Sequence, residues 1–89
     1  MDFVKGQGVI LVEAMSKRDF RKKIIKDVAM MPEFSTLIST GDIEALSELE
    51  KDRLRLALKK AGIPPEYTSS DDSLMGVSIA IAARTVTLS

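Results

Sequence analysis

The chain has 89 residues, enough for one small domain, and its 13 basic and 13 acidic side chains give a formal net charge of zero. Overall charge therefore indicates neither nucleic acid nor a membrane surface as a partner. Cys and His are both absent, which excludes disulfides, thiolate metal sites and the commonest general base. No apolar run approaches the roughly 20 residues that span a bilayer, so we expect a soluble, cytoplasmic chain with no membrane partner.

Residues 1–63 carry the pattern of several short amphipathic helices. Residues 9–15 form an apolar run that fits a buried helix or a strand, and we favour the helix because the run leads directly into a helix start. At that start, Ser16 and Asp19 have the spacing of an N-cap and its N3 acid. Five apolar residues at helical spacing then predict one buried helix face: Phe20, Ile24, Ile25, Val28 and Met31.

Further helical segments are predicted between Pro32 and Gly62. Pro32 ends the preceding helix and suits the first turn of a short helix over residues 33–38. A cluster of turn-forming residues then leads into a single helical turn at residues 43–46. Ser47 and Glu50 form a capping box that opens the longest helix, residues 48–61, and Gly62 is a natural residue to end it.

The composition changes after residue 63. Residues 64–73 contain three acids and no base, and we expect them to form a mobile acidic linker. Residues 74–89 are mostly small or β-branched, with Arg84 as their only charge. Three of their apolar residues alternate with smaller ones, which is the period of an extended chain: Val77, Ile79 and Ile81. The predicted fold class is therefore all-α, with a small bundle of short helices followed by an acidic linker and an extended C-terminal tail.

A single extended tail cannot satisfy its own backbone. Its N–H and C=O groups stay unpaired, and such a strand is not stable in water. The tail therefore needs a surface to receive it. Three such surfaces are compatible with the sequence: this domain or a second copy of it, the sheet edge of another protein, and an enzyme that modifies the tail.

Six basic side chains fall within residues 17–26, with Asp19 and Asp27 as the acids within or beside them. Such a cluster is either a docking surface for an acidic partner or for phosphates, or the solvated side of an amphipathic helix. We favour the solvated side, because no aromatic residue interleaves the charges and no recognition helix follows. Nucleic acid is therefore not expected as a partner.

The sequence does not indicate catalysis by the chain itself. Ser and Thr are plentiful but have no His to activate them, and no carboxylate lies in a context that predicts a raised pKa. The segment Gly6-Gln7-Gly8 lacks the third glycine and the preceding strand of a dinucleotide-binding loop. We expect no enzymatic activity, no metal site and no cofactor bound by this chain.

Three stretches resemble the helical leader domains of ribosomally made, post-translationally modified peptides: Phe20-Arg21-Lys22-Lys23-Ile24-Ile25-Lys26-Asp27, Phe34 to Ile38, and Gly41-Asp42-Ile43-Glu44-Ala45-Leu46. The chain looks like the precursors of split borosin systems, in which a helical domain precedes a Val/Ile/Ala-rich core peptide. The resemblance implies that a separate S-adenosylmethionine-dependent methyltransferase docks on residues 1–63 and methylates backbone amides of residues 74–89. The cofactor would then belong to the partner enzyme, and the two proteins would form a hetero-oligomer.

The same resemblance implies site residues. If methylation follows the alternation, it selects Ile79 and Ile81 first and then Val77. The methyltransferase would dock on the helix after Ser16, through four residues: Arg18, Arg21, Lys22 and Ile25. The alternative function is a small helical interaction module that oligomerises or adds its C-terminal strand, residues 77–88, to a partner's sheet.

Overall fold

The structure, a computed structural model, describes residues 3–88, and every regular element in this range is a helix. The predicted all-α class is therefore confirmed for this part of the chain. Residues 1, 2 and 89, which belong to the predicted segments 1–63 and 74–89, lie outside the described residues.

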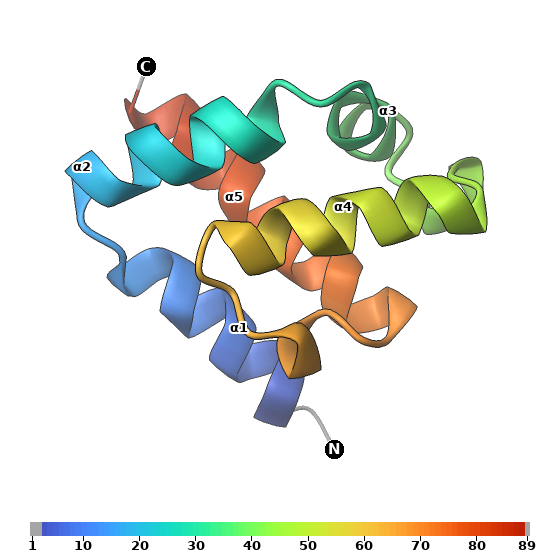
Figure 1. The fold of residues 1–89 in the computed structure, drawn as a ribbon, viewed down its shortest axis with the longest axis horizontal. Coiled ribbons are helices and arrows are strands. Elements are labelled where there is room, and N and C mark those ends of the chain that lie inside the picture. Colours follow the sequence, from blue (N-terminus) through green and yellow to red (C-terminus); the bar gives the residue numbers. More distant parts are fainter. Residues whose placement is uncertain (1–2, 89) are drawn as a thin grey trace.

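The elements follow one another with short connections (Figure 1). Five are α-helices: α1 (Phe3–Ala14), α2 (Lys17–Asp19), α3 (Pro32–Thr40), α4 (Glu48–Lys60) and α5 (Asp71–Leu88). The π-helix η1 (Phe20–Ala29) continues directly from α2, and two 3₁₀ turns complete the set: η2 (Ile43–Ala45) and η3 (Pro65–Tyr67).

The helix starts predicted at Ser16, Pro32 and Ser47 are confirmed, whereas the first helix begins at Phe3 rather than at residue 9, and α5 rather than α4 is the longest helix. The Ser16 hydroxyl accepts the Asp19 N–H at 3.1 Å, and Pro32 opens α3. Ser47 and Glu50 form the capping box of α4, with both of its hydrogen bonds present. Gly62 has a φ of +104°, which few other residues adopt, and so turns the chain away after α4.

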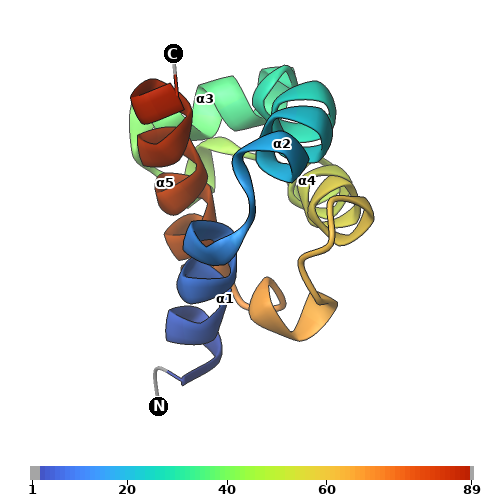
Figure 2. The same ribbon diagram turned by 90° about the vertical axis from the view of Figure 1, so that its left-hand side faces the viewer.

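Helix α5 crosses the molecule behind the other helices and joins them into one core (Figure 1). It packs along α1 and also contacts α3 and η1. Seen from the side, α1 and α5 lie on one side of the molecule, and the α2–η1 segment and α4 lie on the other (Figure 2). The fully buried residues Phe20, Leu54 and Val77 come from both sides, so the core lies between these two layers.

The predicted extended tail is wrong, because residues 71–88 form helix α5. Leu74, Val77 and Ile81 lie at helical spacing and are fully buried in the core. Between them Ser78 is also fully buried, and its hydroxyl donates to the Leu74 carbonyl oxygen at 2.7 Å. This internal hydrogen bond removes the penalty of placing a hydroxyl in the core, so serine belongs to the buried face.

The start of α5 has an N-cap, and the residue that forms it was assigned to the expected linker. The Ser70 hydroxyl accepts the Ser73 N–H at 3.0 Å, as the first residue before a helix commonly does. Asp71 and Asp72 occupy the first turn, where the helix dipole favours negative charge. The acids that suggested a solvated linker thus mark the beginning of a helix.

The segment 64–73 is also folded onto the bundle. It contains η3, and Thr68 within it is 1% exposed. The Thr68 carbonyl oxygen accepts a hydrogen bond from Arg55 Nε of α4 at 2.8 Å. The expected mobile linker is therefore corrected to an ordered connection between α4 and α5.

Helices α1 and α5 approach closely at Gly8. A Cβ atom at this position would lie 2.7 Å from Val77 Cγ2 and 3.2 Å from Tyr67 Cβ, distances that leave no room for a side chain. The residue that weakens α1 as an isolated helix is therefore the one that lets α5 pack against it.

Candidate functional site

Four cationic side chains surround a surface depression on the α2–η1 segment. The depression has a volume of about 580 Å³ and is lined by residues that we call the basic surface: Lys17, Arg18, Arg21 and Lys22. No carboxylate is among these lining residues. In the part of the chain that the structure describes, Lys17, Arg18 and Lys22 form no ion pair.

The winding of η1 explains why two of these cations, Arg21 and Lys22, face outward. Phe20, Ile24 and Val28 recur every four residues, and all three are fully buried. A π-helix has more residues per turn than an α-helix, because its hydrogen bonds join residues five apart. A strict four-residue spacing therefore stays in line along the inner side of η1, and the lysines between these positions remain exposed.

The structure brings together three of the four predicted docking residues. Arg18, Arg21 and Lys22 share the depression, and Lys17, which was not among the predicted residues, completes it. Ile25 does not line it, since this side chain is half-buried and packs against the core. The charge cluster in the sequence was the signal for the basic surface, whereas nothing in the local pattern separated Lys17 from its neighbours.

The predicted methylation residues lie in α5 and do not share one face. Val77 and Ile81 are fully buried, whereas Ile79 is 53% exposed. The extended alternation on which the choice of Ile79 and Ile81 depended is therefore wrong for the folded chain, because a helix turns residues two apart to nearly opposite sides. The amides of all three residues lie within the helix, where each N–H donates to the carbonyl four residues earlier.

Charged side chains of α4 hold the beginning of α5. Lys51, which is nearly fully buried, donates to the carboxylates of Glu48 at 3.0 Å and Asp71 at 3.1 Å. Arg55 donates to the second oxygen of Asp71 at 3.0 Å. The hydrogen bond from Lys51 and the charges of Lys51 and Arg55 lower the pKa of the Asp71 carboxyl, against the opposing effect of burial. The bonds to Glu48 and Asp71 raise the pKa of Lys51 in turn.

Arg84 holds the other end of α5. Its guanidinium group donates to the carbonyl oxygens of Val12 and Met15, at the C-terminal end of α1, and lies 4.7 Å above the centre of the Phe20 ring. The last carbonyls of a helix have no partner within it, so Arg84 satisfies groups that would otherwise need water. The only charge in residues 74–89 is thus explained by the contact between α5 and α1.

The described residues offer no arrangement for metal binding or for crossing a membrane. No group of three or more acidic, His or Cys side chains in this range is placed to hold a metal ion. Likewise, none of the helices there is both long and apolar enough to span a bilayer. The shifted pKa values that the structure shows, at Lys51 and Asp71, arise from the ion pairs of Lys51 with Glu48 and with Asp71 and from the ion pair of Arg55 with Asp71.

Comparison of the chain with protein-family models, with curated proteins and with solved structures gives no match.

Proposed function

We propose that this chain is a binding domain without catalytic activity, and that its basic surface docks on an acidic surface of a partner protein. The observation that carries the proposal is the depression walled by four cations and no carboxylate. The chain is neutral overall, and its acids gather elsewhere: five lie within residues 42–52, against the single cation Lys51. A molecule with separated charges orients an approaching partner, and the basic side meets the acidic patch.

The resemblance to split borosin precursors supplies a class of partner, an S-adenosylmethionine-dependent methyltransferase that acts on backbone amides of α5. For this finer proposal α5 must first leave the bundle and unwind, because an amide nitrogen that donates within a helix is closed to methylation. Exposing Val77 and Ile81 costs about 1.5–3 kcal/mol for each side chain. The free energy of binding at the basic surface and the free energy with which the enzyme binds the unwound segment must together offset this cost.

The test combines docking and modification in one experiment. The full chain is co-expressed with a methyltransferase encoded next to it, and the two are examined for a complex by size exclusion and for methylation by intact mass. We expect a complex that weakens as salt is raised, with the mass of the chain rising in steps of one methyl group. Fragment masses should place the methyl groups at Ile79, Ile81 and Val77.

Charge reversal separates the two parts of the proposal. Lys22→Glu changes the basic surface and should weaken the complex at least tenfold, whereas Lys59→Glu makes the same charge change in the last turn of α4, outside the residues that line the basic surface, and should leave the complex intact. Equal binding by both variants and the wild type would contradict docking by the basic surface. A salt-sensitive complex without any change in mass would instead retain the docking and reject the methylation.

A further inference from the structure

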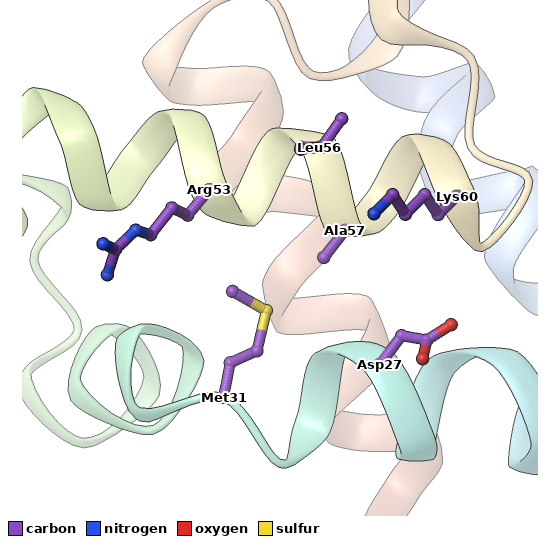
Figure 3. Close-up of a pocket in the computed structure, with 6 residues that line it drawn as sticks. All are labelled: Asp27, Met31, Arg53, Leu56, Ala57 and Lys60. Atoms are coloured by element: carbon purple, nitrogen blue, oxygen red, sulfur yellow. The ribbon is translucent and has the colours of Figure 1, made fainter.

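A second surface feature, separate from the basic surface, lies between η1 and α4. It is a groove of about 340 Å³, which we call the η1–α4 groove, lined by Asp27, Met31, Arg53, Leu56, Ala57 and Lys60 (Figure 3). Met31 points from the η1–α3 junction toward α4, and Ala57 points from α4 toward Met31, so these two form an apolar floor. Charged side chains occupy the rim.

The charged residues that line the groove are two cations, Arg53 and Lys60, and one carboxylate, Asp27. Arg53 forms an ion pair with the buried Glu33 at 3.5 Å but keeps 62% of its side chain exposed. Asp27 and Lys60 stand on opposite walls, and in the described part of the chain neither one forms an ion pair (Figure 3). A guest carboxylate near Lys60 or near the exposed part of Arg53 would meet a positive charge, with Asp27 as the carboxylate among the lining residues that opposes it.

Exposed apolar and cationic residues also lie along the outer side of α4. Leu49 and Leu56 lie seven residues apart and are 62% and 53% exposed. Arg53 and Lys60 follow them at intervals of four, so that all four residues fall on one stripe of the helix. Two leucines at heptad spacing, alternating with two cations, form the pattern of a helix that packs against another helix.

We propose that this stripe and the η1–α4 groove bind an amphipathic helix of a partner protein, with apolar residues against Leu49, Leu56 and the groove floor and with carboxylates against Arg53 and Lys60. This is the helix-in-groove mode of recognition, in which residues at heptad spacing are the anchors. A second copy of this chain is a poorer occupant, since the stripe carries two cations and no carboxylate of its own to place against them. The proposal does not depend on the basic surface.

The probe is a synthetic helical peptide with leucines at heptad spacing and glutamates beside them, titrated into the full chain. Backbone amide shifts in ¹⁵N-labelled chain show where it binds, and fluorescence anisotropy gives its affinity. Leu56→Asp and Arg53→Glu should each weaken binding at least tenfold. The matched control Ile10→Asp, at a residue of α1 that is 63% exposed, should bind as the wild type does, and so should Lys22→Glu.

A swap of charges makes the test independent of any loss of folding. Arg53→Glu combined with Lys60→Glu should prefer a peptide with lysines in place of the glutamates, which a partly unfolded variant could not do. The proposal is overturned if the wild type binds both peptides alike, or neither up to the solubility limit. It is also overturned if the chain dimerises through this stripe and Leu56→Asp makes it monomeric, which would assign the surface to a second copy.

Discussion

Helix α5 and the α2–η1 segment use opposite means to place a helix in the bundle. The α2–η1 segment separates large apolar residues from cations, so that its inner and outer sides differ sharply. In α5 most residues on both sides are small or β-branched, and even a serine is part of the buried face. A helix can therefore be placed in the bundle without a difference in polarity between its two sides, because the elements packed around it decide which side is buried.

The two regions therefore have different roles: α5 mainly stabilises the fold, and the α2–η1 segment also presents exposed cations. Most of the inward face of α5 is committed to the core, and its ends are held by Asp71 and Arg84. The α2–η1 segment contributes Phe20, Ile24 and Val28 to the same core and leaves its cations exposed. Changes in α5 should affect folding first, whereas changes in the exposed cations should affect binding first.

The largest expected effect comes from a pair of variants two residues apart in α5. Ile81→Ala should lower the free energy of unfolding by about 2–5 kcal/mol, because it opens a cavity in the core. Ile79→Ala should change it by less than about 0.5 kcal/mol, since Ile79 is mostly solvated. Urea unfolding followed by circular dichroism measures both. Similar effects at the two positions would indicate that residues 74–88 do not pack as α5.

The sequence was sufficient to predict the helical class and three of the helix starts before Gly62, because their signals are local. Ser16, Pro32 and Ser47 each act within one turn, through a cap or a fixed φ angle, and the structure shows them in these roles. The cations of the basic surface were visible for the same reason. Ile25 was assigned to docking although its own spacing with Phe20 and Ile24 indicated burial.

The state of residues 74–88 could not be decided from their own pattern. Residues two apart at 77, 79 and 81 fit an extended chain, while Leu74, Val77, Ser78 and Ile81 fit a helix once the serine hydroxyl is satisfied internally. The evidence that selects the helix lies far away in the chain, at Gly8 and at the α1 carbonyls that receive Arg84. The local signals for the start of α5 were Ser70, Asp71 and Asp72, and they were interpreted as part of a linker.

A smaller decrease in the free energy of unfolding is expected when Arg84 is replaced. Replacement by Met keeps most of the aliphatic length but removes the donors to two α1 carbonyls, which should cost about 1.5–3 kcal/mol of unfolding free energy. Lys59→Met is the control, because it removes one charge from an exposed position without a comparable contact. Hydrogen exchange should also accelerate at the C-terminal turn of α1. An Arg84→Met variant as stable as the wild type would show that α5 does not depend on this contact.

Because α1 and α5 approach closely at Gly8, we expect that adding a single methyl group there lowers the free energy of unfolding. Gly8→Ala gains up to about 1 kcal/mol of helix propensity, but forcing Cβ against Val77 costs about 1–3 kcal/mol, so the net loss should reach about 2 kcal/mol. The Val77→Ala background provides the internal control. With Val77 Cγ2 removed, the 3.2 Å approach to Tyr67 Cβ remains, so Gly8→Ala should cost less than in the wild type; additive effects in the double variant would argue against the contact with Val77.

The smallest effect is a dependence of stability on pH at the start of α5. The pKa of Asp71 is lower in the folded chain than in the unfolded one, so its ion pairs stabilise the fold at neutral pH. This contribution declines as the pH falls below about 4, where the unfolded carboxyl begins to bind protons, and is lost once the pH passes below the folded pKa. Asp71→Asn should therefore be less stable than the wild type at pH 7, and the two should converge in acid.

Asp72→Asn separates the ion pairs from the helix dipole. Asp72 shares the first turn of α5 with Asp71 but is exposed, and in the described structure it forms no ion pair with Lys51 or Arg55. Both variants lose a negative charge near the positive end of the helix, an effect of about 0.3–1 kcal/mol. Any further loss in Asp71→Asn measures what Lys51 and Arg55 contribute. If unfolding curves from pH 2 to pH 7 are the same for the two variants, α5 is held by its apolar face and by Arg84, without help from α4 at its start.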